Sequence, residues 1–250
     1  MSGHSKWSSI KHKKGAADAK RGQLFTKLAR AIQVAARDGG PDPNGNAALA
    51  TAVQKARDAS MPKENIERAI AKGAGNDADA AAWETAVYEG YAPGGVAVLV
   101  ETLTDNRNRT GSEVRHTFSR NGGSLGEPGS VAWTFDKKGV VLVDAERHDE
   151  DDLIAAIDAG AQDLTRDENV WEIVTAPGDL PAVRTALEEA GVEIESADLT
   201  MRPQTKVEVD GDRVARVLRL IEALEDHEDV AAVHANFDVD AATLERLAPA

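Results

Sequence analysis

The spacing of apolar residues changes once along this chain, at a polar stretch of small residues from 74 to 82. Before that stretch, apolar side chains recur at steps of three and four residues, which is the period of one face of an α-helix. After it, short aliphatic runs typical of strands alternate with further helical patterns. The sequence therefore predicts a helical unit, a linker, and a second unit in which helices and strands are mixed.

The first part predicts a small bundle of short helices at residues 18–37, 46–59 and 63–72. Gly39, Gly40 and Pro41 end the first helix. Pro62 separates the second helix from the third, because proline lacks an amide donor and pushes the preceding residue out of the helical region. Gly73 ends the third helix.

The second part predicts two kinds of unit. Residues 139–201 read strand, helix, strand, strand, helix, strand, which is the split βαββαβ order of a ferredoxin-like domain. Its expected elements are 139–144, 149–159, 163–166, 170–175, 180–190 and 192–201. The flanking segments have expected strands at 86–91, 96–103, 131–135, 206–209 and 230–239, and helices at 110–121 and 212–225. Because a stable sheet needs several strands, we expect the two flanking segments to pair as one domain.

The predicted fold class is therefore a multidomain α+β protein: an N-terminal three-helix domain, then an α+β domain interrupted by an inserted ferredoxin-like βαββαβ domain. The predicted boundaries are 1–75 for the basic helical domain with its flexible N-terminal arm, 83–136 plus 203–240 for the discontinuous α+β domain, and 137–202 for the inserted domain. These units are named below the helical, the discontinuous and the ferredoxin-like domain.

Charge is divided unequally between these domains. Residues 1–75 hold 14 Lys and Arg against six Asp and Glu, a net charge of +8, whereas the remaining residues hold 15 against 37, a net charge of −22. A segment-sized excess of one sign attracts an oppositely charged polymer through its summed field and through counterion release. We therefore expect the helical domain to bind a polyanion and the acidic remainder to repel nucleic acid.

The basic arm carries an aromatic residue among its cations. The expected nucleic-acid-binding residues of the arm and of the start of the first helix are His4, Lys6, Trp7, Lys11, His12, Lys13, Lys14, Lys20 and Arg21. Lysines and arginines neutralise phosphates, and an indole ring can stack on an unpaired base for roughly 1 to 3 kcal/mol. The alternative is a solubilising, disordered arm. Trp7 argues against that alternative, because a large aromatic residue is unusual in a free tail.

Two further sets of cations extend this surface. Lys27 and Arg30 share one side of the first helix with Lys20, so with the arm they are expected to form a continuous basic strip. An ordinary solvated helix face is the alternative. Arg107 and Arg109 lie near the start of a later expected helix, where a phosphate would also meet free backbone amides. Capping of that helix by Asn or Thr, with the arginines at the surface, is equally open.

The sequence lacks the motifs of an enzyme, a metal site or a membrane protein. It contains no cysteine, which excludes disulfides, thiolate nucleophiles and Cys-containing zinc sites and favours a reducing compartment. No Walker loop, nucleophile elbow, HExxH pair or dinucleotide fingerprint is present. The longest strictly aliphatic run, 96–100, is far shorter than the roughly 20 residues of a membrane helix, and no secretory signal is present. We expect a cytoplasmic protein with no catalytic residue, metal, cofactor or small-molecule substrate.

Several ordered motifs make the chain similar to the YebC/PmpR family. They are GHSKW at 3–7, IKHKK at 10–14, ARDGGPDP at 36–43, MPKENIERAI at 61–70, VYEGYAPGGVAVLVETLTDNRNRT at 87–110, GGSLGEPGSVAWTF at 122–135 and VHANFD at 233–238. The resemblance covers essentially the whole chain. It implies a helical domain followed by an α+β domain into which a ferredoxin-like domain is inserted, and it implies no enzyme activity.

The resemblance also implies control of gene expression, but it does not decide whether the protein binds DNA or RNA. Bacterial members of the family are described as DNA-binding transcriptional regulators, and a mitochondrial relative is a translational activator of a cytochrome oxidase subunit. Some bacterial relatives are connected with rescuing ribosomes that slow on proline-rich stretches. Our preferred interpretation is a non-enzymatic, DNA-binding transcriptional regulator. The alternatives are a translation factor that binds ribosomal RNA on the ribosome and a protein-interaction scaffold.

Overall fold

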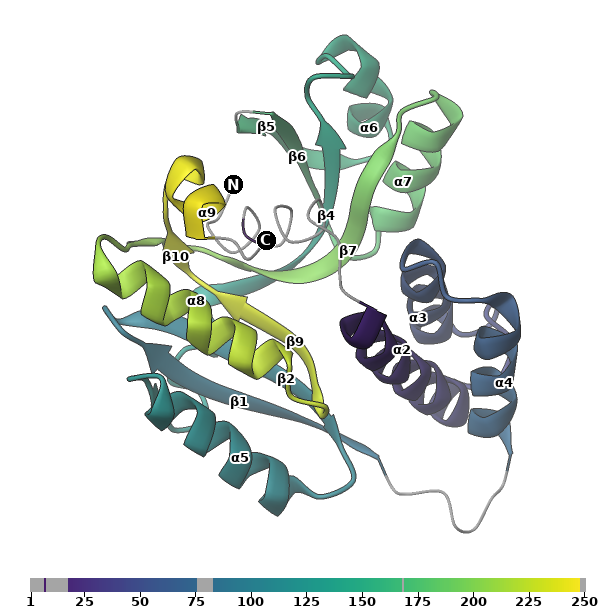
Figure 1. Ribbon diagram of the computed structural model, residues 1–250. Coiled ribbons are helices and arrows are strands. Elements are labelled where there is room, and N and C mark those ends of the chain that lie inside the picture. Colours follow the sequence, from purple (N-terminus) through teal and green to yellow (C-terminus); the bar gives the residue numbers. More distant parts are fainter. Residues whose placement is uncertain (1–6, 8–17, 76–82, 168, 248–250) are drawn as a thin grey trace.

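The structure is a computed structural model that describes residue 7 and residues 18–75, 83–167 and 169–247. Figure 1 shows a helical bundle beside two sheets that carry their own helices. The predicted fold class is confirmed, because the chain combines an N-terminal helical domain with two four-stranded antiparallel sheets. No helix within the described ranges is long and apolar enough to cross a membrane.

The helical domain consists of α2 (Asp18–Gly39), α3 (Ala47–Asp58) and α4 (Lys63–Ala74). Asn46 fixes the turn between α2 and α3: its Oδ1 accepts from the backbone amide of Leu49 at 3.0 Å, and its Nδ2 donates to carbonyl oxygens at the end of α2. A Cβ atom at Gly73 would lie 2.3 Å from the carbonyl oxygen of Gln33. Glycine at this position therefore lets α4 pack closely against α2.

The first sheet takes strands from both flanking segments of the sequence, in the order β3-β1-β2-β9. Its strands are β1 (Glu84–Ala92), β2 (Val96–Thr104), β3 (Ser124–Leu125) and β9 (Val230–Ala235), and its helices are α5 (Arg107–Arg120) and α8 (Asp212–Glu225). Val100, Phe118 and Leu220 are fully buried in the core between this sheet and the two helices. Because β9 pairs antiparallel with β2, the late segment completes the sheet begun by the early one.

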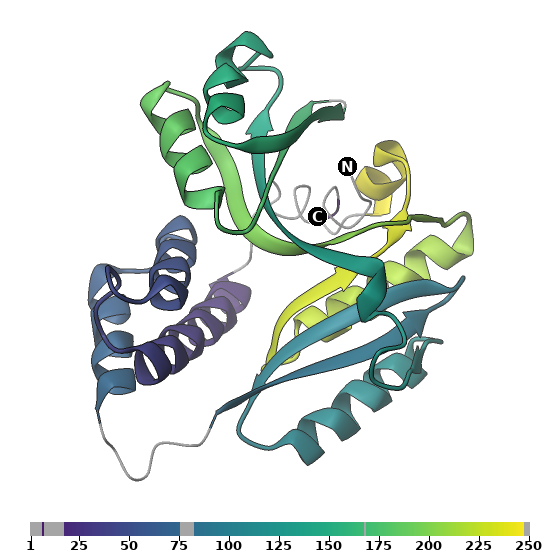
Figure 2. The ribbon, with the colours of Figure 1, turned by 180° about the vertical axis from the view of Figure 1, so that it is seen from behind.

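The second sheet has the order β5-β6-β4-β7, the arrangement of the split βαββαβ unit. Its elements are β4 (Phe135–Asp144), the 3-10 turn η2 (Asp151–Leu153), α6 (Ile154–Asp158), β5 (Ala161–Asp167), β6 (Val170–Thr175), α7 (Leu180–Glu189) and β7 (Ile194–Pro203). Where one helix over 149–159 is expected, the chain forms η2 and the short α6. Figure 2 shows that β4 and β7 connect this domain to the first sheet.

The expected strand 131–135 is wrong, because most of it forms the 3-10 turn η1 (Ala132–Thr134). The backbone amides of Val131 and Ala132 donate to the carboxylate of Glu89, at 2.7 and 2.8 Å. These donors are therefore not available to a neighbouring strand.

The end of the chain also differs from the expectation. The expected strand 230–239 is divided into β9 and β10 (Phe237–Asp238), and β10 pairs with β8 (Val207–Glu208) in a separate small sheet. Asn236 lies at the division, where its side chain accepts a hydrogen bond from a β2 amide at 2.8 Å. Helix α9 (Ala241–Leu247) follows and was not expected.

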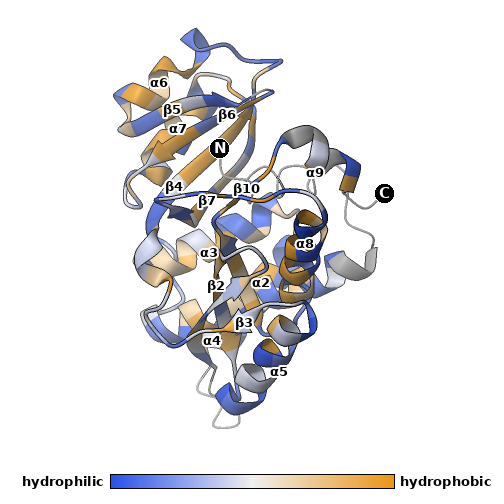
Figure 3. Cartoon of the chain, turned by 90° about the vertical axis from the view of Figure 1, so that its left-hand side faces the viewer, coloured by the Kyte–Doolittle hydropathy of each residue, from blue (hydrophilic) through white to orange (hydrophobic). Residues whose placement is uncertain are grey.

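Figure 3 shows the amphipathic character of the two helices on the first sheet. Both α5 and α8 carry orange and blue residues along their length, as expected for helices with one face on a sheet. The buried residues of α8 recur at short helical steps and are Val214, Val217, Leu218, Leu220, Ile221 and Leu224. The outer faces of α5 and α8 are consequently polar and lie in solvent.

Candidate nucleic-acid interface

Most of the expected arm residues lie outside the described part of the chain. They are His4, Lys6, Lys11, His12, Lys13 and Lys14. Lys20 lies in α2, but its side chain is likewise not described. The role of these residues in nucleic-acid binding stays a prediction. Arg21, the next residue of α2, is exposed, and its guanidinium carbon lies 5.6 Å from the centre of the Phe25 ring.

Trp7 is buried, which corrects the expectation of an indole ring that is free to stack on a base. Its side chain is 1% exposed and belongs to the apolar core of the discontinuous domain, together with residues of the first sheet, α8 and α9. The indole is a large apolar group, and its burial stabilises the fold by about 25 cal/mol for each Å² removed from water. In this structure Trp7 packs inside the protein.

Lys27 contacts the discontinuous domain, so it does not lie on an open basic strip. Its ammonium group donates a hydrogen bond to the carbonyl oxygen of Glu225, at the end of α8. Burial lowers the pKa of the Lys27 side chain below its ordinary value, although Asp226 and Glu225 oppose this shift. Lys27 therefore helps to hold α2 against α8.

Arg30 makes a second contact between the same two domains. Its side chain is 20% exposed, donates to the carbonyl oxygen of Glu228 at 3.0 Å, and lies 3.5 Å from a carboxylate oxygen of Asp229. Its guanidinium carbon also lies 4.6 Å from the centre of the Trp83 ring. The side of α2 that carries Lys27 and Arg30 thus meets carboxylates and carbonyl groups of the protein itself, and the expected continuous strip is interrupted there.

Asp229 lies at the centre of these contacts and is almost completely buried, with a side chain 1% exposed. Its Oδ2 accepts hydrogen bonds from the guanidinium of Arg109 and the hydroxyl of Thr110, both at 2.7 Å. Burial alone would raise the pKa of Asp229, but the hydrogen bonds from Arg109 and Thr110 outweigh it, so the pKa lies below its ordinary value. A charged carboxylate therefore joins α2, α5 and the turn before β9.

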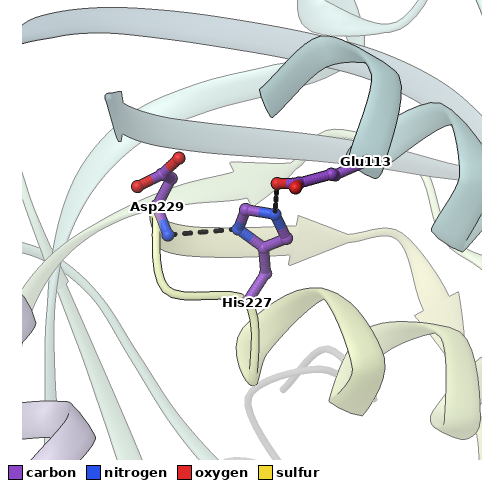
Figure 4. A group of neighbouring side chains, drawn as sticks. All are labelled: Glu113, His227 and Asp229. Atoms are coloured by element: carbon purple, nitrogen blue, oxygen red, sulfur yellow. Dashed lines mark hydrogen bonds and ion pairs between the residues drawn. The ribbon is translucent and has the colours of Figure 1, made fainter. Parts of the chain in front are cut away.

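Glu113, His227 and Asp229 have possible ligand atoms within 4.8 Å of one another, and Figure 4 shows how they lie. Nδ1 of His227 accepts from the backbone amide of Asp229 at 3.1 Å, so we infer that its Nε2 carries the proton and donates to Glu113 at 2.8 Å. The Asp229 carboxylate is already bonded to Arg109. Both ring nitrogens of His227 are thus engaged in hydrogen bonds, and the arrangement is that of a structural hydrogen-bond network.

The two arginines of the expected second phosphate site differ. Arg109 is held by the buried carboxylate described above and by Asp105 at 2.9 Å, so its guanidinium already has anionic partners. Arg107 is more exposed, at 60%, and lies 3.6 Å from a carboxylate oxygen of Glu84. Asn106 caps α5 by accepting from the backbone amide of Arg109 at 3.1 Å, as the capping alternative requires. A phosphate contact at this helix start stays a prediction.

An exposed aromatic residue that the sequence analysis did not select lies on the glycine-rich loop after β3. Trp133 is 70% exposed, and its indole nitrogen donates to the carbonyl oxygen of Ser130 at 3.2 Å. The loop is held by Glu89, whose carboxylate accepts from three backbone amides at 2.6 to 2.8 Å. Burial would raise the pKa of Glu89, but these hydrogen bonds lower it. The signal in the sequence is a tryptophan beside a loop of Gly, Pro and Ser residues.

The helical domain contacts the ferredoxin-like domain through paired charges. Arg184 of α7 makes two hydrogen bonds of 2.8 Å to the two carboxylate oxygens of Asp58, at the end of α3. Lys55 lies 3.1 Å from a carboxylate oxygen of Asp198 on β7. A groove of about 530 Å³, lined by both apolar and polar residues, separates α2 and α3 from the ends of β1 and β2. The helical domain is therefore held by discrete polar contacts around this groove.

Comparisons with known proteins agree with this architecture. A family model described as "TACO1/YebC protein N-terminal domain" matches residues 5–76, and one described as "TACO1/YebC second and third domain" matches residues 83–237. A conserved hypothetical protein from Aquifex aeolicus, known from its crystal structure, aligns with a TM-score of 0.79 at 48% identity, covering 89% of this chain and 92% of that one.

Two relatives carry the same descriptive name, "probable transcriptional regulatory protein". The protein from Acidothermus cellulolyticus is 58% identical over 245 residues, which is 98% of this chain and 99% of that protein. The protein from Rubrobacter xylanophilus is 58% identical over 240 residues, which is 96% of both chains.

Proposed function

The chain belongs to the TACO1/YebC family, and from that premise we propose that it regulates gene expression by binding nucleic acid, without catalysing a reaction. The names of its relatives support the regulatory role. The observation that carries the nucleic-acid partner is the division of charge, with 14 basic and six acidic residues in positions 1–75 against 15 and 37 in the remainder.

DNA is the first candidate for the nucleic acid. The helical domain offers lysines and arginines, which neutralise phosphates and carry little sequence information by themselves. The affinity for DNA should therefore depend steeply on salt and only weakly on sequence. A transcriptional regulator should still prefer some regions upstream of genes.

This candidate is tested by fluorescence anisotropy with labelled duplexes at near-physiological salt. Fragments upstream of genes are compared with random duplexes of the same length. A DNA-binding regulator binds some upstream fragments more tightly than the random set. Equal affinity for every duplex would count against a transcriptional role.

RNA on the ribosome is the second candidate, and Trp133 favours it. An aromatic ring that is 70% exposed on a loop held by hydrogen bonds can stack on an unpaired base, and unpaired bases are common in folded RNA and absent from regular duplex DNA. Rigid presentation reduces the conformational entropy lost when the ring binds.

Sedimentation with ribosomes at moderate salt tests this second candidate. Trp133→Ala should reduce the ribosome-bound fraction without changing any charge. The matched control is Ile157→Ala on α6, which removes another apolar side chain that is 52% exposed. Protein that stays at the top of the gradient under all conditions excludes the ribosomal role, and equal loss in both variants removes the argument from Trp133.

A further inference from the structure

A second basic surface lies on the acidic part of the chain, in a hollow between α5 and α8. The hollow has a volume of about 280 Å³ and is lined by Arg120, Asn121, Gly122, Arg216 and Arg219. Figure 1 shows α5 and α8 lying side by side on the first sheet. Arg120 lies at the end of α5 and the other two arginines lie in α8, so the fold brings together cations that are far apart in the sequence.

The three arginines have exposed side chains and none of them forms an ion pair within the part of the chain that the structure describes. Arg219 donates only to a backbone carbonyl oxygen of its own helix, at 3.1 Å. By contrast, Arg213 in the first turn of α8 lies 2.6 Å from a carboxylate oxygen of Asp210. The hollow is therefore a local concentration of positive charge in a part of the chain with a net charge of −22.

The stability of the fold does not account for this arrangement. A cation in the last turn of a helix interacts favourably with the helix dipole, which explains Arg120. Arg216 and Arg219 lie outside both the first and the last turn of α8, so the dipole favours neither. Like charges gathered at one hollow repel each other, and an anion that binds between them removes that repulsion.

We infer that this hollow binds a backbone phosphate of the nucleic acid, an inference that rests on the proposed function. The guanidinium group presents planar, paired N–H donors that match phosphate oxygens, and three such groups around one concave site surround the anion on several sides. Asn121 Nδ2 already donates one hydrogen bond to the carbonyl oxygen of Thr117 at 2.8 Å, so the three arginines are the main donors for the phosphate.

A polymer fits this geometry better than a free anion does. The far end of α8 meets the helical domain, where Glu225 accepts the hydrogen bond from Lys27. Arg219 lies six residues before Glu225, which is about 9 Å along a helix that rises 1.5 Å per residue. The hollow and the helical domain are thus separate contact points, and a nucleic acid strand can reach both.

The test is the salt dependence of binding, measured with the full chain. Labelled single-stranded RNA and duplex DNA of the same sequence are titrated by fluorescence anisotropy at several salt concentrations. The variant Arg120→Gln/Arg216→Gln/Arg219→Gln removes the three charges. Its control is Arg120→Lys/Arg216→Lys/Arg219→Lys, which keeps them. All three side chains are exposed, so both variants should fold, and circular dichroism verifies this.

The glutamine variant should bind more weakly, and the slope of log K against log salt should be shallower by about 0.7 for RNA or by about 0.9 for duplex DNA, which is the contribution of one phosphate contact. The lysine variant should keep most of the slope. A nucleic acid whose slope changes by its expected amount is one that the hollow contacts, and a nucleic acid whose slope is unchanged is not. If the wild type binds and the glutamine variant binds with the same affinity and slope, the inference is wrong while the proposed function stands. If the wild type binds neither nucleic acid, both are wrong.

Discussion

Asp229 is the residue on which the contacts between the helical and discontinuous domains converge. It accepts hydrogen bonds from Arg109 and Thr110 of α5, and Arg30 approaches it from α2. Removing one side of a buried, hydrogen-bonded ion pair leaves the other side without its partner, which destabilises a protein more than the intact pair stabilises it. Asp229 should therefore matter more for stability than the exposed carboxylates around it.

Asp229→Asn should lower the free energy of unfolding by about 2 kcal/mol, because a hydrogen bond to a charged group contributes about 1.5 to 3 kcal/mol. Urea denaturation followed by circular dichroism measures the change. The control is Glu228→Gln, the adjacent residue, whose side chain is 70% exposed and whose loss should change stability by less than about 0.5 kcal/mol. Equal effects of the two variants would contradict this account of Asp229.

The pKa of Asp229 also predicts how stability depends on pH. The folded-state pKa is lowered, so between the unfolded value of about 3.9 and that lower value the unfolded chain binds the proton more readily than the folded chain. The contribution of Asp229 is fully present above the unfolded pKa and is lost as the pH falls through the folded pKa. From pH 6 to pH 3, wild-type stability should fall more steeply than that of Asp229→Asn. Parallel curves would show that Asp229 does not contribute to acid unfolding.

At the scale of elements, the loop between β3 and β4 is ordered by one side chain from another strand. The carboxylate of Glu89 in β1 accepts from the amides of Gly129, Val131 and Ala132. In Glu89→Gln the side-chain NH₂ group must face at least one of these donors in either orientation of the amide. The loop that positions Trp133 should then open more often.

Hydrogen–deuterium exchange measures this opening directly. In Glu89→Gln, the amides of 129–132 should exchange faster than in the wild type, while those of β2 remain protected. Glu127→Gln, an exposed glutamate on the same loop, serves as the control and should leave the exchange unchanged. Unchanged protection in Glu89→Gln would mean that other contacts hold the loop.

The elements that the sequence predicts well are those determined by local periodicity. The spacing of Val214, Val217 and Leu224 indicates α8 with its observed bounds of 212–225, and the βαββαβ order leads to the observed second sheet. The elements that were predicted wrongly depend on hydrogen-bond partners that are distant in the sequence. The strand expected at 131–135 is lost because its amides donate hydrogen bonds to Glu89, and the final strand is divided where the Asn236 side chain accepts a hydrogen bond from a β2 amide.

The residues of the candidate interface were also predicted only as far as local sequence allows. The sequence places Lys27 and Arg30 on one side of a helix, but it cannot show that carboxylates and carbonyl groups of the region 225–229 lie opposite them. Trp7 in a basic arm is typical of a nucleic-acid contact, whereas its burial depends on a core built from residues after 83. The arginine hollow likewise could not be predicted from the sequence, because only the packing of α5 against α8 brings its three arginines together.

At the scale of the whole molecule, the charge division remains the strongest sign of a polyanionic partner, and the structure refines where cations are available. Lys27, Arg30 and Arg109 are engaged in contacts within the protein. Arg21 and the arginine hollow are exposed. The acidic part is thus not uniformly repulsive, because the arginine hollow places positive charge within it.

The most direct test of the proposed function is ultraviolet crosslinking in cells, followed by sequencing of the attached nucleic acid. It is performed on the wild type, on Lys11→Glu/Lys13→Glu/Lys14→Glu, and on Lys137→Glu/Lys138→Glu/Lys206→Glu, which makes the same charge change in the acidic part. We predict that the wild type and the second variant crosslink to specific DNA or RNA sequences and that the first variant loses this signal. Crosslinking of the wild type at background level, or undiminished crosslinking of the first variant, would contradict the account.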